Sequence, residues 1–237
     1  MTVKYINNDL AQDGAYIFKD IPWGSHICGI YQSIDDLINM LIPFFKFGLQ
    51  KNEFCIWITS EFINKNQAKQ LLRNYMPEYD YYEGKGQIEI LSYEEWYLQS
   101  GEFNVTEVLS SWDKKIDEAL NKGFLGIRAS GDITWLNNII RPVFQNYESI
   151  LNNKFNQLKL IAICTYQLSK CTDIELINVI NNHKYLLVNN EYNFNLISDL
   201  DRLERMDVLS KMSASIAHEI RNPITSVKGL LQLLQQK

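Results

Sequence analysis

Short apolar runs, each followed by a longer amphipathic segment, set the strongest limit on how this chain can fold. The most apolar is Leu158–Tyr166 (LKLIAICTY), and two others are the HICGIYQ run from His26 and Glu53–Thr59 (EFCIWIT). Strands that are apolar along their whole length are buried on both faces, as in a parallel sheet covered by helices on either side. Residues 1–195 are therefore predicted to form an α/β domain with a mostly parallel sheet.

The first predicted helix follows the HICGIYQ run. Ser33 offers a side-chain cap and Asp36 stands three residues later, which is the spacing of a capping box. Apolar residues then recur at helical spacing over residues 37–45. Pro43 should kink or shorten this helix, and Gly48 suits its end.

Further elements alternate along the rest of this region. The predicted order is a polar helix to about Tyr75, a strand in 87–92 (QIEILS), a helix over 106–121, a strand in 123–131 (GFLGIRASG), and a helical segment over 133–155 with a break at Pro142.

The composition changes near Tyr192. From Leu196 onward the first glycine is Gly229, and the only proline is Pro223. Apolar residues recur mostly at spacings of three and four: Leu203, Met206, Leu209, Met212, Ile216, Ile220, Val227, Leu230 and Leu234. Residues 196–237 are thus predicted to form one helix about 60 Å long. Its narrow apolar stripe needs a partner helix, most simply that of a second copy of the chain.

Composition narrows the functions open to such a chain. The net charge is −5 and the isoelectric point is about 5.3, whereas a nucleic-acid binder needs a basic face. The longest apolar-rich stretch, 37–49, contains Asn39, Pro43 and Lys46, and is shorter than the roughly 20 residues that span a bilayer. Four cysteines and no visible secretory signal indicate reduced thiols. We expect a cytoplasmic protein with no nucleic-acid partner and no membrane span.

Histidine and cysteine side chains give weak grounds for a metal site. His26, Cys28, Cys164 and Cys171 offer soft ligands, and His26 and Cys28 share one face of a predicted strand. No pair has the C-x2-C or H-x3-H spacing typical of zinc sites. We therefore expect no metal, and we interpret His183 as an exposed residue without an evident partner.

One histidine of the predicted C-terminal helix is placed for chemistry. At about 100° per residue, His218 lies roughly 200° from Ile216 and Ile220 and so faces water. An exposed imidazole keeps a free ring nitrogen and can act as a nucleophile. Glu219 could orient the ring or accept its proton, and Asn222 could position a water or a phosphoryl oxygen. A lone surface histidine more often has no such role, so spacing alone leaves the question open.

The sequence around His218, SIAHEIRNPITSVKGLLQLL, closely resembles the H-box of sensor histidine kinases, especially the sporulation-kinase-like group with H-E-I-R-N-P. The resemblance implies that His218 is the phosphoacceptor. It would take the γ-phosphoryl group of ATP and pass it to an aspartate of a response regulator. Glu219 and Asn222 match the family's acid/base and phosphatase-linked positions, and the helix is expected to form a homodimer.

ATP binding is not expected of this chain itself. In that family a second helix and an ATP-binding domain follow, whereas this sequence stops at Lys237. The Gly84-Lys85-Gly86 turn lacks the G-x-x-x-x-G-K-[ST] pattern of a phosphate loop. ATP is therefore expected as a phosphoryl donor held by a kinase ATP-binding domain that acts as a partner, with no cofactor bound by this chain.

The N-terminal region resembles the MEDS sensory domain (methanogen/methylotroph sensory domain). The resemblance rests on three blocks: HICGIYQSIDDLINMLIPFFKFGLQKNEFCIWITSE, GFLGIRASGDITW and LKLIAICTYQLSK. It implies a fold related to RecA- and KaiC-type proteins. Where a RecA-type ATPase has its phosphate loop, this sequence has Tyr31–Asp36 (YQSIDD), without the glycines and the lysine. We interpret the domain as a degenerate nucleotide-binding fold that serves as a sensor.

Ligands of open α/β sheets bind outside the carboxyl ends of the strands. Several polar and aromatic residues are expected at that edge, where they would line a pocket for an unknown small molecule: Tyr31, Glu61, Arg128, Asp132, Trp135, Tyr166 and Gln167. Packing or capping would explain each of them equally well, and Arg128 with Asp132 could be a simple salt bridge.

Two functions from different classes fit these observations. The first is the signal-sensing and phosphoacceptor part of a two-component sensor histidine kinase, in which ligand binding changes access to His218 through the long helix. The second is a truncated, non-catalytic interaction protein that forms heterodimers with a kinase or titrates its signal.

Overall fold

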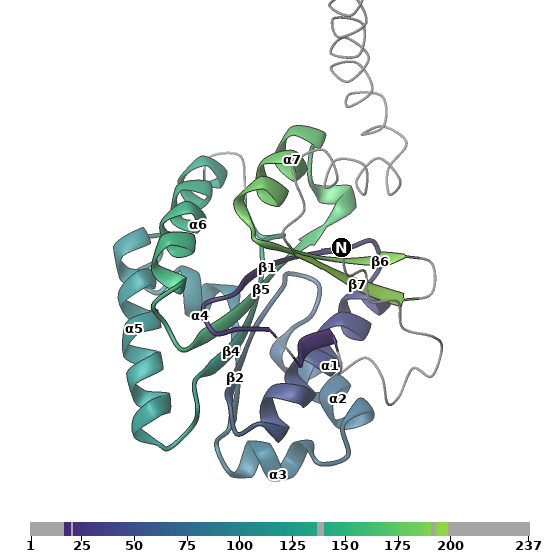
Figure 1. The fold of residues 1–237 in the computed structure, drawn as a ribbon, viewed down its shortest axis with the longest axis vertical. Helices are drawn as coiled ribbons and strands as arrows, with labels where there is room; N and C mark the ends of the chain where they lie inside the picture. The colour runs from purple at the N-terminus through teal and green to yellow at the C-terminus, as the bar shows by residue number, and fades with distance from the viewer. Residues whose placement is uncertain (1–16, 20, 137–139, 191–192, 199–237) are drawn as a thin grey trace, which may run out of the picture.

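A single seven-stranded sheet runs through the computed structural model, which describes residues 17–19, 21–136, 140–190 and 193–198 (Figure 1). The strand order is β3-β2-β4-β5-β1-β6-β7. The neighbours from β3 to β6 pair in parallel, and β7 pairs antiparallel with β6. The strands are β1 (His26–Tyr31), β2 (Phe54–Thr59), β3 (Ile88–Ser92), β4 (Ile127–Asp132), β5 (Leu160–Gln167), β6 (Tyr185–Asn190) and β7 (Asn193–Ser198).

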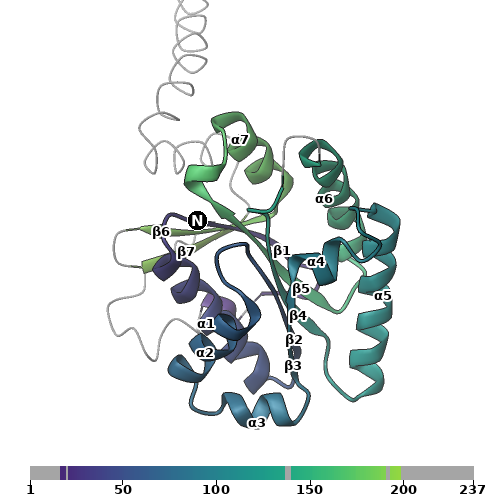
Figure 2. The same cartoon turned by 180° about the vertical axis from the view of Figure 1, so that it is seen from behind.

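Helices cover both faces of this sheet, so the predicted α/β class is confirmed (Figure 2). One core lies under α1 (Ile34–Gln50), α2 (Lys65–Tyr75) and α3 (Tyr79–Gly84). The other core lies under α4 (Tyr93–Tyr97), α5 (Val105–Asn121), α6 (Arg141–Phe155) and α7 (Asp173–Asn182). A short 3-10 helix, Leu168–Lys170, leads from β5 toward α7. The strands β1 and β2 are buried along their whole length, which is why their sequences are largely apolar runs. β4 is also buried throughout, although it carries Arg128, Ser130 and Asp132.

The start of α1 forms as predicted. The Ser33 hydroxyl accepts a hydrogen bond from the Asp36 amide, and the Asp36 carboxylate accepts one from the Ser33 amide. The same reciprocal capping box begins α2, α4 and α7, with Asn64, Ser92 and Thr172 as the N-cap residues.

Pro43 does not shorten this helix as predicted, and the helix ends two residues after Gly48. The helix α1 continues through both residues to Gln50. A proline inside a helix costs about 3 kcal/mol, and the burial of Met40, Leu41, Phe44 and neighbouring apolar side chains offsets that cost. Gly48 does not end the helix. A Cβ atom at this position would lie 2.7 Å from Cδ of Arg128, so a glycine leaves room for the arginine side chain.

The predicted helix over 133–155 is shorter than expected. A turn closed by the Leu136 amide and the Ile133 carbonyl follows β4, and α6 begins only at Arg141. Pro142 lies in the first turn of α6, where no intrahelical bond to its nitrogen is needed. The proline therefore marks the start of the helix and not a break within it.

The sheet extends past the predicted domain boundary at residue 195. The last strand, β7, includes Leu196 and ends at Ser198, so these positions are not helical. The remainder of the predicted C-terminal helix, residues 199–237, lies outside the described residues. Among the helices that the structure describes, none has both the length and the apolar character needed to cross a membrane.

Candidate functional site

The three residues of the H-box, His218, Glu219 and Asn222, lie outside the described part of the chain. Within the described α/β domain, polar side chains gather at two places. One is the carboxyl edge of the sheet, where a ligand was predicted to bind, and the other is a buried cluster around His26.

At the carboxyl edge, three neighbouring strands are linked through the Asp132 carboxylate, which ends β4. Its Oδ2 accepts hydrogen bonds from the Tyr31 hydroxyl at 2.8 Å and the Thr165 hydroxyl at 3.0 Å. Its Oδ1 accepts from the Thr134 amide at 2.9 Å and hydroxyl at 2.5 Å. Burial raises the pKa of Asp132, and these hydrogen bonds oppose the rise. We call Tyr31, Asp132, Thr134 and Thr165 the carboxyl-edge network.

Trp135 lies next to this network within an aromatic cluster. Its ring stacks on Tyr93, with centroids 5.5 Å apart, and on Tyr97, with centroids 5.2 Å apart. The rings of Phe103 and Phe144 pack against it at 5.9 Å. The indole Nε1 of Trp135 is buried and has no hydrogen-bond partner among the described residues. The cluster thus places a donor in an apolar, aromatic environment.

The other residues predicted at this edge differ in their surroundings. Gln167 ends β5 and is partly buried, and its Oε1 has no hydrogen-bond partner in the described residues. Tyr166 is buried, and its hydroxyl donates to Glu148 of α6. Glu61 is exposed in the loop after β2. Tyr31, Asp132 and Trp135 are thus buried at the carboxyl edge, and Gln167 pairs with Tyr31 in the sheet at the same edge.

The prediction for Arg128 is wrong. Arg128 is the second residue of β4 and lies at the amino end of the strand, away from the carboxyl-edge network. Its Nε donates to Oε2 of Glu53 at 2.5 Å, and its guanidinium lies over the rings of Phe44 and Phe47. It forms a buried ion pair with Glu53 and not a salt bridge with Asp132.

Four buried side chains converge on the face of the sheet that α6 and α7 cover. His26 of β1, Glu148 of α6, Cys164 of β5 and His183 after α7 are each less than a tenth exposed. One potential ligand atom from each lies within 4.8 Å of all the others. We call these four residues the His–Cys cluster. Its geometry is that of a site able to hold a metal ion.

Sequence reasoning missed half of this cluster. His183 was expected to be exposed, but it is 1% exposed, and its ring bonds to the Val179 carbonyl at 2.7 Å. It is the C-cap residue of α7, two residues before the start of β6, and packing of α7 on the sheet buries it. Glu148 carried no signal beyond its place in the apolar pattern of α6. An acidic residue on the apolar face of α6 could have indicated that Glu148 is buried and needs a polar partner.

Burial controls the protonation of the His–Cys cluster. It lowers the pKa of His26 to about 4, so the imidazole is neutral at pH 7. It raises the pKa of Glu148 to about 7 and the pKa of the Cys164 thiol well above its ordinary value. A neutral imidazole is the form that binds metal ions.

The β1–α1 turn does not offer a phosphate site. In a phosphate loop, free backbone amides at the helix start bind the anion. Here the Gln32 and Ser33 amides donate to the Asp36 carboxylate, at 3.1 and 3.0 Å. Asp35 adds a second acidic residue to the first turn of the helix. This geometry agrees with the interpretation of a degenerate nucleotide-binding fold.

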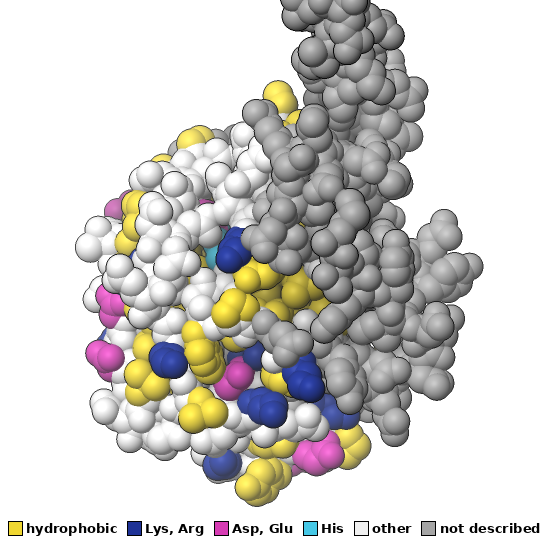
Figure 3. All heavy atoms as spheres, viewed as in Figure 1, with side chains coloured by type: hydrophobic (Ala, Val, Ile, Leu, Met, Phe, Trp, Pro, Cys, Tyr) yellow, Lys and Arg dark blue, Asp and Glu magenta, His cyan; other side chains and the backbone are white. Residues whose placement is uncertain are grey.

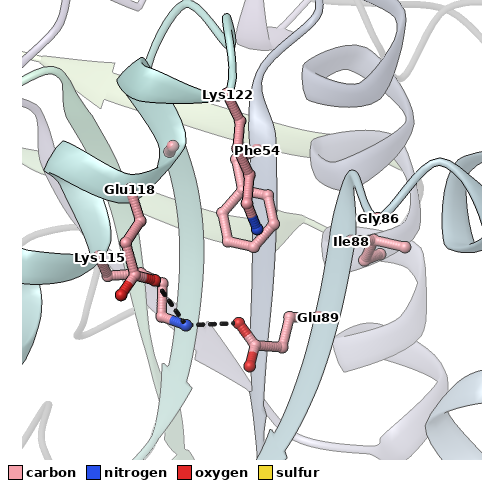
Figure 4. A pocket seen from close by; sticks show the side chains of 8 residues that line it. Phe54, Gly86, Ile88, Glu89, Lys115, Glu118 and Lys122 are labelled. Carbon is pink, nitrogen blue, oxygen red and sulfur yellow. Dashed lines mark hydrogen bonds and ion pairs between the residues drawn. The ribbon is translucent and has the colours of Figure 1, made fainter.

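A surface pocket of about 230 Å³ lies at the opposite edge of the sheet from the predicted ligand site (Figure 4). It lies beside the amino ends of β2 and β3, between Phe54 and the last turns of α5. Lys115 points into it but is paired with Glu89 at 2.9 Å and with Glu118 at 3.7 Å. With Lys122, the lining carries two positive and two negative side chains, so its charge favours neither an anionic nor a cationic ligand.

On the face in Figure 3, most of the visible Lys and Arg side chains of the described residues lie in the lower half of the view. Lys and Arg are interspersed with Asp and Glu there. A phosphate backbone would need a continuous basic patch on the face that it contacts.

Comparison with known proteins identifies both parts of the chain. Residues 25–184 match the family model of MEDS, the methanogen/methylotroph, DcmR sensory domain. Residues 208–237 match the His Kinase A (phospho-acceptor) domain, which belongs to two-component signalling. The H-box residues lie within the second match.

Curated relatives match short segments of the chain. A segment of 50 residues is 44% identical to sporulation kinase B of Bacillus subtilis (strain 168), and covers 21% of this chain and 12% of that protein. Sporulation kinase D of the same organism is 47% identical over 34 residues, which are 14% of this chain and 7% of the relative. The chain thus aligns with only a small part of these kinases.

A solved structure matches the α/β domain. The KaiC-like protein PH0186 from Pyrococcus horikoshii OT3 aligns with a TM-score of 0.52 and 14% identity, over 84% of this chain and 88% of that one. At this identity the likeness shows the fold alone, and it confirms the predicted relation to KaiC-type folds. The MEDS match covers more than half of the sequence, and its residues form the strands β1 to β5 and the helices α1 to α7. The chain therefore belongs to the MEDS family of sensory domains, here joined to a match for a histidine kinase phospho-acceptor domain.

Proposed function

We propose that this chain is the sensing and phosphoacceptor part of a two-component sensor histidine kinase, and that His218 carries the phosphoryl group. The observation that carries the proposal is the match of residues 208–237 to the phospho-acceptor domain, in which the sequence reads A-H-E-I-R-N-P around His218. The MEDS match supplies the sensory half.

The proposed chemistry is a transfer in two steps. A ring nitrogen of His218 attacks the γ-phosphorus of ATP held by a kinase ATP-binding domain, a P–N bond forms, and the P–O bond to ADP breaks. Glu219 accepts the imidazole proton as the P–N bond forms. A carboxylate oxygen of a response-regulator aspartate then attacks the phosphorus, an acyl phosphate forms, and the P–N bond breaks to return the His218 imidazole, which regains a proton. Asn222 positions a phosphoryl oxygen or a water. The segment acts as a homodimer, since its apolar stripe needs a partner helix.

Signal detection is proposed at the carboxyl edge of the sheet. Hydrogen-bond acceptors come from the Asp132 carboxylate and the Gln167 amide, and a donor comes from the Trp135 indole. These groups lie beside aromatic rings, as polar groups do in small-molecule sites. The antiparallel pair β6–β7 is the last described part of the chain before residues 208–237 in the sequence. A ligand that shifts β6 and β7 would thereby change access to His218.

Phosphotransfer can be tested with the full chain and a separately purified ATP-binding domain of a sporulation kinase. With γ-labelled ATP, the wild type should take up label that is labile in acid and stable in base, as a phosphoramidate is. His218→Gln should abolish the labelling. Glu219→Gln should slow labelling while leaving it detectable, because the nucleophile is retained.

Arg202→Gln serves as a matched control, because it alters a charged residue of the same predicted helix outside the H-box. It should be labelled at the wild-type rate. Equal labelling of the wild type and His218→Gln would refute the phosphoacceptor role. Heterodimer formation with a kinase and no labelling at any residue would instead favour the non-catalytic interaction protein.

A further inference from the structure

We propose that the His–Cys cluster, His26, Glu148, Cys164 and His183, is a binding site for one divalent transition-metal ion of the zinc class. The inference rests on geometry within the α/β domain and does not depend on phosphotransfer by His218. All four ligand atoms already lie within 4.8 Å of one another. His26 Nε2 is 3.0 Å from Cys164 Sγ, and His183 Nε2 is 3.9 Å from Glu148 Oε1.

Both imidazoles are oriented by hydrogen bonds on their outer nitrogens. The Nδ1 of His183 lies 2.7 Å from the Val179 carbonyl, which can only accept, so this nitrogen carries the proton. The Nδ1 of His26 lies 2.7 Å from Oδ1 of Asn152, whose amide nitrogen donates to the Asn182 carbonyl. Asn152 therefore accepts from His26. Both Nε2 lone pairs face the cluster, as in metal sites where a second residue fixes each ligating histidine.

The carboxylate is oriented in the same way. The Tyr166 hydroxyl donates to Oε1 of Glu148 from the end of β5. Ligating carboxylates in metal sites are hydrogen-bonded by such outer residues. Three of the four proposed ligands thus have a second residue that holds them toward the centre.

The donor set selects the metal. Two imidazole nitrogens, one thiolate and one carboxylate oxygen form a four-coordinate set of the kind that zinc prefers, whereas magnesium and calcium need mainly oxygen ligands. On binding, the Cys164 thiol and the Glu148 carboxyl each release a proton to solvent. The two negative charges then balance the dication, and the buried site is neutral overall.

The ion would connect four separate segments. His26 begins β1, Cys164 lies within β5, Glu148 is in α6 and His183 joins α7 to β6. Metal binding should therefore stabilise the packing of α6 and α7 on the sheet, since an ion that binds only the folded state raises its stability.

The test uses the full chain, stripped of metal with a chelator and titrated with Co²⁺ as a spectroscopic probe for zinc. The titration is run on the native chain and again during refolding from denaturant, so that slow entry into a closed site does not hide binding. We expect one equivalent of Co²⁺ to give tetrahedral d–d bands and a thiolate-to-cobalt charge-transfer band. Zn²⁺ should displace it, and Mg²⁺ should not.

Variants assign the bands to the cluster. Cys164→Ala should lose the charge-transfer band. Cys55→Ala removes a buried cysteine from the other core and should keep it. Asn152→Ala should keep the bands but weaken the affinity about 10- to 100-fold, as expected for loss of a residue that orients a ligand. Zinc should raise the melting temperature of the wild type and of Cys55→Ala, but not that of Cys164→Ala.

Two results would overturn the proposal. The first is a wild-type chain that gives no tetrahedral cobalt spectrum in either titration, a result that needs no variant to fold. The second is a charge-transfer band that survives in Cys164→Ala. Neither result bears on phosphotransfer, which is measured separately at His218.

Discussion

Arg128 and Glu53 form an ion pair at the amino ends of β4 and β2, with Nε and Oε2 2.5 Å apart and both side chains almost fully buried. The pair joins the second residue of β4 to the residue before β2. The rings of Phe44 and Phe47 pack on the guanidinium and exclude water from it. Losing one partner would leave the other charge buried and unpaired, which is costly.

We predict that Arg128→Met lowers the free energy of unfolding by about 3–5 kcal/mol, the cost of leaving the Glu53 carboxylate unpaired in the interior. Urea unfolding followed by circular dichroism measures this. The control is Arg73→Met, which breaks exposed ion pairs with Asp80 and Glu83 and should cost far less, because water screens these charges. Equal losses in the two variants would contradict the importance of the buried pair.

Gly48 lies against this arginine, which gives a second prediction. Alanine normally stabilises a helix relative to glycine by about 0.5–1 kcal/mol. At Gly48 the new methyl group would lie 2.7 Å from Cδ of Arg128, so Gly48→Ala should instead destabilise the domain by about 1–3 kcal/mol. Gly84→Ala is the matched control, because a Cβ at that helical position meets nothing within 4 Å. Thermal unfolding of both variants should give shifts of opposite sign.

The sequence correctly predicted those strands and helix ends whose local sequence patterns match the burial of their side chains in the fold. β1, β2 and β5 were found from continuous apolar runs, and the start of α1 from the Ser33–Asp36 capping box. Pro43 failed as a signal because the packing of α1 on the sheet outweighs the local cost of a proline. Tertiary contacts decided that position.

The candidate site was predicted less well, and for a different reason. The end of a strand determines which residues reach the carboxyl edge. The predicted strand over 123–131 ended one residue before β4 does, so Asp132 was placed correctly at this edge. Arg128, four positions earlier, was not. The His–Cys cluster joins residues 26, 148, 164 and 183, which only the strand order β5-β1-β6 brings together. The spacing of these residues in the sequence therefore cannot predict that they lie close together.

The third prediction concerns the carboxyl-edge network. Tyr31→Phe removes one hydrogen bond to the buried Asp132 carboxylate and should lower the free energy of unfolding by about 1–3 kcal/mol. Tyr81→Phe makes the same chemical change at a ring that is 67% exposed and should have almost no effect. Chemical unfolding of the two variants side by side provides the measurement. If Tyr31→Phe left the free energy of unfolding unchanged, the hydrogen bond from Tyr31 to Asp132 would not stabilise the fold.

The fourth prediction is a pH dependence at the α2–α3 contact. A hydrogen bond from Lys69, at 2.8 Å, is the largest cause that lowers the pKa of Glu83 below its ordinary value of 4.5, and Tyr79 adds another. A carboxyl with a lowered folded-state pKa stabilises the fold above its unfolded-state pKa, and this contribution is lost as the pH falls through the folded-state value. The coupling in a Lys69→Met and Glu83→Gln double-mutant cycle should therefore be about 0.2–1 kcal/mol at neutral pH and vanish in acid. Coupling that persists once Glu83 is protonated would show that the contact is not ionic.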